Sequence, residues 1–139
     1  MRDAGAAGPV VRSRVEALDL AIVSSARRAQ DTWAAVASAW PRTPQHATDE
    51  RIYEAWVDDL LLLLREVSDS VTSLALVGHN PGFEELAFSL ASASSDPMAM
   101  ETMGKKFPTS ALATFSVSSG WGAVAHGCAD LTSFDIPRA

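Results

Sequence analysis

The chain has 139 residues, of which 47% are hydrophobic and 20% are charged. This balance excludes a disordered segment and a chain of several domains, so we expect one domain over residues 1–139 with a core of its own. The formal net charge of −6 disfavours nucleic acid and anionic lipid surfaces as partners. Any site for an anion therefore has to be local.

The residue types and apolar runs of the sequence exclude further classes of protein, such as disulfide-bonded and membrane-spanning ones. Cys128 is the only cysteine, so an internal disulfide is impossible. No apolar run is long enough to cross a bilayer, and residues 1–11 lack the apolar region of a signal peptide. We therefore expect a cytoplasmic protein without a membrane partner. The three histidines are scattered, so we expect no metal and no cofactor.

Two structural units are predicted in the first half of the chain. Residues 18–23 form an apolar run typical of a buried strand, and residues 26–40 have helical composition until Pro41 stops them. After a polar loop over 41–50, a second helix is predicted over 55–67. Its apolar stripe comprises Trp56, Leu60, Leu63, Leu64 and Val67.

The second half repeats the strand-to-helix pattern and then changes. Residues 72–77 predict a buried strand, residues 78–82 a sharp turn, and residues 83–94 a helix. Residues 111–117 and 118–126 alternate around a glycine-containing turn, which predicts an antiparallel hairpin. We expect an α/β fold with a mostly parallel sheet flanked by helices and an antiparallel C-terminal hairpin.

Two strand–helix junctions carry residues with chemical potential. Ser24 and Ser25 can cap the helix after the first strand, and the guanidinium of Arg28 suits a phosphate. At the second junction, Gly78 and the following Asn-Pro-Gly turn present His79 as an acid, a base or a donor to negative charge. The alternative is that neither junction binds a ligand. In that case Ser24 only caps the helix, Arg27 and Arg28 are solvated surface charges, and His79 is structural.

Four segments together resemble a known family: VSSARRAQDT, RIYEA, LALVGHNPGFEELAFSLA and KFPTSALATF. Their order and separation are similar to the histidine phosphatase superfamily, and specifically to its SixA-type phosphohistidine phosphatase branch. The resemblance implies a phosphoglycerate-mutase-like sheet. It also implies a two-step transfer in which a histidine takes the phosphoryl group and water then releases it.

The resemblance assigns roles to particular residues. Arg28 matches the phosphate-binding arginine, with Ser24 beside it, and His79 matches the histidine that stabilises the phosphoryl oxygens. Glu54 falls near the position of the proton-donor carboxylate in many members, although a solvated glutamate is the alternative. Thr109 and Ser110, in the loop 107–110, are expected to approach the pocket.

The resemblance breaks at the N-terminal end. The family's arginine-histidine-glycine motif is absent from this sequence. We therefore expect the chain to start partway through the fold, without the first strand, the nucleophilic histidine and one arginine. A slot of roughly 10 Å is expected between the strands at 18–23 and 72–77, and copies are expected to self-associate through it. His46 and His126 are expected at the surface.

The sequence thus supports a hydrolase of phosphohistidine or small phosphoesters, with a phosphorylated protein or a small phosphorylated molecule as substrate. The chain as written is expected to be inactive or weakly active, since loss of a covalent nucleophile removes several powers of ten in rate. The alternative is a non-catalytic phosphate-binding or interaction domain. A third hypothesis uses Ser24 or Ser25 as nucleophile with His79 as base, without the usual G-x-S-x-G motif.

Overall fold

The structure, a computed structural model, describes residues 2–137, with side chains from residue 5 onward. The α-helices are α1 (Arg2–Arg14), α2 (Arg27–Ala37), α3 (Val57–Arg65), α4 (Gly82–Leu90) and α5 (Pro97–Lys105). The strands are β1 (Leu20–Ser24), β2 (His46–Asp49), β3 (Leu74–Val77), β4 (Leu112–Val117) and β5 (Ala129–Asp135). Two short 3₁₀ helices are η1 (Glu50–Ile52) and η2 (Trp121–Ala123). Across residues 2–137, the helices are too short or too polar to cross a membrane.

Strand β1 lies at the centre of a three-stranded parallel sheet with the order β2-β1-β3. Its side chains Ala21, Val23 and Ser24 are fully buried, which explains the continuous apolar run in the sequence. The register pairs Ser24 with Asp49 and Val23 with Val77. All three strands therefore end at the same edge of the sheet.

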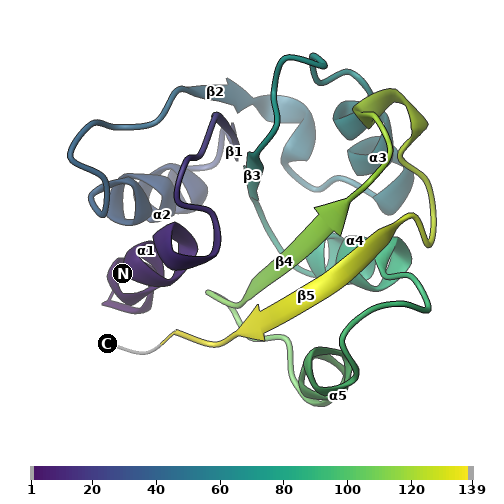
Figure 1. Cartoon of the computed structure of the whole chain (residues 1–139). Coiled ribbons are helices and arrows are strands. Elements are labelled where there is room, and N and C mark those ends of the chain that lie inside the picture. Colours follow the sequence, from purple (N-terminus) through teal and green to yellow (C-terminus); the bar gives the residue numbers. More distant parts are fainter. Residues whose placement is uncertain (1, 138–139) are drawn as a thin grey trace.

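Helices cover both faces of this sheet (Figure 1). Val23 packs with Trp33 in the core that α1 and α2 form on one face. The neighbouring residue Ile22 points to the other face, where it packs with Leu60 and other residues of α3 and α4. This alternation is the period of two that a strand imposes on its side chains.

The last two strands form a separate antiparallel pair with an irregularity between Thr114 and Phe115. Helix α5 packs against β5. Together the two sheets confirm the predicted α/β class, with its mostly parallel sheet and C-terminal hairpin.

The predicted second strand of that hairpin, at 118–126, is wrong. These residues form a long connection that contains η2, and the strand begins only at Ala129. The indole of Trp121 donates a hydrogen bond of 2.8 Å to the carbonyl of Val71, which fixes the connection against the loop before β3.

The predicted slot between the strands at 18–23 and 72–77 is also wrong. β1 and β3 pair directly, from Leu20 opposite Leu74 to Val23 opposite Val77. Within the described residues, β3 pairs with no strand on its other side, and β4 pairs only with β5. Side chains of β3 and β4 nevertheless share one core. The unpaired backbone groups thus lie on the outer edge of β3, and self-association stays a prediction.

Several boundaries differ from the sequence prediction for identifiable reasons. The predicted loop at 41–50 contains the edge strand β2, whose polar sequence conceals it. The helix predicted over 83–94 ends at Leu90, and α5 follows as a separate helix. Trp56, predicted on an apolar stripe, instead precedes α3 and is 74% exposed. Ala26, rather than Ser24 or Ser25, is the N-cap of α2.

Candidate functional site

The ends of β1 and β3 are joined by a serine–histidine pair. Nε2 of His79 lies 2.8 Å from Oγ of Ser24, a side chain that is fully buried. The same Oγ accepts a hydrogen bond of 3.3 Å from the amide of Ala26. Ser24 therefore positions the imidazole at the point where α2 begins.

Close packing on both sides fixes the turn that carries His79. A Cβ at Gly78 would come within 2.5 Å of the ring of Phe83, and one at Gly82 within 2.7 Å of the carbonyl of Ala55. Glycine is therefore required at Gly82, where the obstructing atom belongs to the backbone, whereas a side chain at Gly78 would have to displace the ring of Phe83.

The side chain of Asn80 also holds this turn in place, through two hydrogen bonds. Its Oδ1 accepts a hydrogen bond from the amide of Glu84 at 3.2 Å, and its Nδ2 donates to the carbonyl of Phe107 at 3.2 Å. The first bond ties the turn to α4 and the second ties it to the loop before β4. The imidazole of His79 is thus presented from a rigid support.

Two effects lower the pKa of His79 below the ordinary histidine value of 6.5. Burial of the imidazole is the larger effect, and the positive charge of Arg28 is the second. Both disfavour the imidazolium and so favour the neutral imidazole at pH 7. A neutral imidazole has one N–H to donate and one nitrogen that can accept.

Arg28 is a cation that acts on His79 and has no carboxylate of its own. Within residues 2–137, its guanidinium makes no ion pair, whereas the adjacent Arg27 lies 3.8 Å from Asp31. Arg28 is exposed in the first turn of α2, where the helix dipole is positive. A cation, a helix N-terminus and a neutral imidazole together favour an anion.

Gln30 belongs to this site although the sequence did not indicate it. Its Nε2 donates to the carbonyl of Ser24 at 2.8 Å and to Oγ1 of Thr48 at 3.0 Å. This side chain therefore holds the ends of β1 and β2 together. The sequence carried no signal for it because the bridge depends on the pairing of β1 with β2.

Tyr53 is the second contact that sequence reasoning missed. Its ring centre lies 5.8 Å from that of His79, and the two planes are nearly perpendicular at 86°. The residue belonged to a segment that carried the family resemblance, but nothing in the spacing indicated contact with the imidazole.

The remaining sequence-predicted candidates lie near the site without a defined contact to it. Glu54 follows Tyr53, is exposed, and adopts a φ of 57°. Across the described residues, its carboxylate makes no hydrogen bond or ion pair. The loop 107–110 is joined to the His79 turn by the hydrogen bond from Asn80 to the carbonyl of Phe107. The role of Glu54 as proton donor stays a prediction.

The other two histidines lie elsewhere. His46 begins β2, opposite Ala21 and a strand length from the edge that holds His79, and its ring tilts against Trp33 at 5.8 Å. His126 is exposed and pairs with Ser89, a residue of α4. His79 is therefore the histidine that the fold brings to the strand ends.

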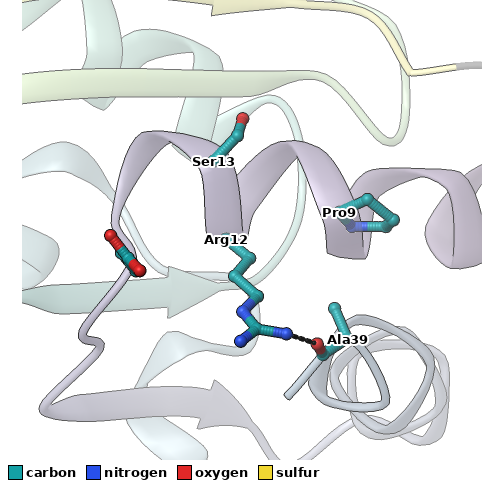
Figure 2. A pocket seen from close by; sticks show the side chains of 5 residues that line it. Pro9, Arg12, Ser13 and Ala39 are labelled. Carbon is teal, nitrogen blue, oxygen red and sulfur yellow. Dashed lines mark hydrogen bonds between the residues drawn. The ribbon is translucent and has the colours of Figure 1, made fainter.

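A separate concave surface lies beside α1 (Figure 2). It is lined by Pro9, Arg12, Ser13, Glu16 and Ala39. Arg12 donates a hydrogen bond of 2.7 Å to the carbonyl of Ala39, just past the end of α2. Arg28 lies at the start of that helix. Because α2 has eleven residues, its two ends are roughly 16 Å apart, so this surface and the site at Arg28 are distinct regions. Among the residues that the structure describes, no cluster of three potential metal ligands is present.

Proteins of two mycobacterial species are similar to this chain over nearly its whole length. No family model matches the chain. An uncharacterized protein of Mycobacterium tuberculosis is 38% identical over 139 residues, which is 99% of this chain and 85% of the relative. An uncharacterized protein of Mycobacterium leprae is 30% identical over 138 residues and is covered to 83%.

Solved structures decide the assignment. A protein assigned as the phosphohistidine phosphatase SixA of Nakamurella multipartitia superimposes with a TM-score of 0.85 and 26% identity, over 99% of this chain and 81% of that one. The chain belongs to the SixA-type histidine phosphatases. The same fold is found in the SixA assigned in Agrobacterium tumefaciens, with a TM-score of 0.74, 24% identity and 97% and 78% coverage. It is also found in a protein histidine phosphatase SixA complexed with tungstate, with a TM-score of 0.73, 16% identity and 97% and 79% coverage.

Within this SixA-type chain, the fold brings Ser24 and His79 into contact and places Arg28 close enough to act on the imidazole. These are the positions that the family resemblance marked for phosphate binding. Their distribution over two strand ends and one helix start is typical of ligand sites in parallel sheets.

Proposed function

We propose that this site binds the phosphoryl group of a phosphohistidine or a small phosphoester, in a hydrolase of the phosphohistidine phosphatase type. The observation that carries the proposal is the 2.8 Å contact that fixes His79 against Ser24 at the strand ends, beside Arg28. Arg28 is exposed, lowers the pKa of the imidazole, and makes no ion pair within residues 2–137. An incoming phosphoryl group supplies the missing negative charge.

Each side chain then has a defined task. Arg28 binds phosphoryl oxygens through its guanidinium fork. His79 donates its N–H to an oxygen whose negative charge grows during transfer, and Ser24 keeps the ring oriented. Glu54 is proposed as the acid that protonates the leaving group.

The reaction implied by the family needs a further histidine. That histidine attacks phosphorus in line, and the P–N bond forms as the bond to the leaving group breaks. Water then attacks the phosphohistidine, which releases inorganic phosphate and the free imidazole. His79 holds the oxygens in this scheme, and neither His46 nor His126 contacts the Ser24–His79 pair in the described structure.

We therefore propose that the nucleophile is carried by a strand alongside the outer edge of β3. That edge is unpaired within the described residues, and its carboxyl end leads directly to His79. A strand there would satisfy backbone groups of β3 and deliver its own last residue to the same corner. The 139 residues alone are expected to be inactive or weakly active.

Two proteins test this proposal: the 139-residue chain and a form extended at its N-terminus by a strand ending in Arg-His. The short chain should release little phosphate from p-nitrophenyl phosphate or a phosphohistidine peptide. The extended form should be active, and His79→Ala should abolish that activity. Rapid turnover by the short chain that survives His79→Ala would overturn the site assignment.

A non-catalytic phosphate-binding domain is the alternative, favoured because residues 2–137 bring no second histidine to the strand ends that hold His79. Under this alternative, the extended form stays inactive while both proteins still bind phosphate in an Arg28-dependent manner. The activity assay and a binding measurement therefore separate the two.

A further inference from the structure

Two large aromatic side chains stand exposed on the segment that passes the His79 turn. Tyr53 is 55% exposed and Trp56 is 74% exposed, and both lie between η1 and α3. Exposed aromatic side chains beside a polar site often mark a binding surface.

The segment that carries Tyr53 is nevertheless held firmly. Ile52, the preceding residue, is buried, and the amide of Tyr53 donates to the carbonyl of Glu50 at 3.2 Å. The carbonyl of Ala55 is pressed against Gly82. These contacts fix the backbone at Tyr53 in a position from which its ring projects into solvent.

A second set of bonds anchors the segment at η1. Arg51 donates to Asp49 at 2.8 Å and to Glu66 at 2.9 Å, which links the end of β2 to the end of α3. The amide of Trp56 donates to the carboxylate of Asp59 at 3.0 Å and closes the start of α3. An aromatic ring on such a support loses little freedom when a ligand packs on it.

The contact between Tyr53 and His79 places this ring beside the proposed phosphoryl site. Their centres are 5.8 Å apart at an interplanar angle of 86°, the edge-to-face arrangement that aromatic pairs prefer. A phosphoryl ligand of His79 brings its leaving group close to the imidazole, and Tyr53 is the ring that contacts this imidazole and stays 55% exposed. The exposed part of Tyr53 is available to that leaving group.

We propose that Tyr53 is a specificity-determining residue that packs against a planar leaving group, so that the site prefers a phosphoryl group attached to an imidazole or aryl ring over one attached to a small alkyl group. This inference rests on the proposed function. It gives a role to Tyr53, to which the sequence motifs assigned none. It also attributes the preference for a planar leaving group to Tyr53 and not to the residues that contact the phosphoryl group.

The test compares phenyl phosphate with methyl phosphate by calorimetry on the 139-residue chain at pH 7. The two esters carry the same phosphoryl group and differ in the leaving group. Phenyl phosphate should bind about 3- to 10-fold more tightly, the size of an aromatic contact. Tyr53→Ala should remove this preference by lowering the affinity for phenyl phosphate more than that for methyl phosphate, whereas Tyr53→Phe should keep it.

Phe88→Ala is the matched control, because Phe88 is an exposed aromatic residue, at 41%, near the far end of α4. It should keep the preference. A preference that survives Tyr53→Ala, or an equal loss for both esters, overturns the inference alone. Failure of methyl phosphate to bind, or binding unaffected by Arg28→Ala, overturns the proposed function together with it.

Discussion

Two regions of this molecule pair a serine with a histidine, and they differ in everything around the pair. Ser24 and His79 meet at the carboxyl ends of β1 and β3, where Ser24 is buried and the charge of Arg28 acts on the imidazole. Ser89 and His126 meet between α4 and the loop before β5, where His126 is exposed. The comparison teaches that the serine contact does not by itself define a site: burial and a neighbouring cation set His79 apart, and the proposed anion site rests on them.

The largest expected effect separates the two adjacent arginines of α2. Arg28→Ala should weaken inorganic phosphate binding by about 10- to 100-fold, because a hydrogen bond to a charged group contributes roughly 1.5–3 kcal/mol. Isothermal titration calorimetry at low salt measures this. Arg27→Ala is the control, since Arg27 is exposed and already lies near Asp31. Equal affinities for the wild type and Arg28→Ala would contradict the assignment.

The next effect compares the two histidines directly. His79→Ala should weaken phosphate binding by about tenfold, because it removes a donor aimed at the anion and the ring that fills the corner. His126→Ala should change the affinity by less than about twofold, since the ring is exposed and remote from Arg28. Competition with a fluorescent phosphate analogue would measure both. Equal losses in the two variants would remove the distinction between the regions.

A smaller effect concerns the serines and is expected in stability. Ser24→Ala removes the buried acceptor of the Ala26 amide and the partner of His79, which should lower the free energy of unfolding by about 1–3 kcal/mol. Ser89→Ala should cost less than about 0.5 kcal/mol, as is usual for a partly exposed position. Urea denaturation gives both values. A larger loss for Ser89→Ala would reverse the ranking of the two pairs.

The smallest effect is a pH dependence of stability. The pKa of His79 is lower in the folded chain than its ordinary value near 6.5, so the unfolded chain binds more protons between these two values. The contribution of His79 to stability is therefore present above pH 6.5 and is lost as the pH falls towards the folded pKa. Urea denaturation between pH 5 and 8 should show this fall, and His79→Gln should reduce it. An unchanged slope in His79→Gln would place the titration elsewhere.

The sequence was informative where a strand is buried on both sides. The runs at 18–23 and 72–77 predicted the strands β1 and β3. The central strand β1 is the buried one, because helices cover both of its faces, whereas all four residues of β3 are partly buried. The polar edge strand β2 gave no such signal, and all but one of its residues are exposed. Trp56 fitted the helical period of its neighbours, yet it lies just before α3, where the carboxylate of Asp59 caps the amide of Trp56 and sets the boundary. Apolar patterns in the sequence therefore indicate which segments are buried. They do not predict where a helix or strand ends when tertiary contacts set that boundary.

The candidate site divides in the same way. Ser24, Arg28 and His79 follow directly from strand ends and a helix start, so the sequence could predict that they lie near one another. Their role in phosphate binding stays a prediction. Tyr53 could not be found, because its contact with His79 depends on how η1 and α3 pack beside the turn at Gly82. The predicted slot was misplaced for a related reason. Strand order comes from tertiary pairing, and the apolar runs of β1 and β3 contain no information about which strand lies beside them.

The central claim is that Arg28 and His79 converge on one anion, and nuclear magnetic resonance can test it directly. Sulfate is a suitable probe because its charge is constant over the relevant pH range. At a fixed pH near 6, added sulfate should shift the ring signals of His79 towards the protonated form, and Arg28→Ala should abolish this shift. The signals of His46 and His126 should not move. Equal movement of all three histidines, or a His79 response that survives Arg28→Ala, would contradict the account.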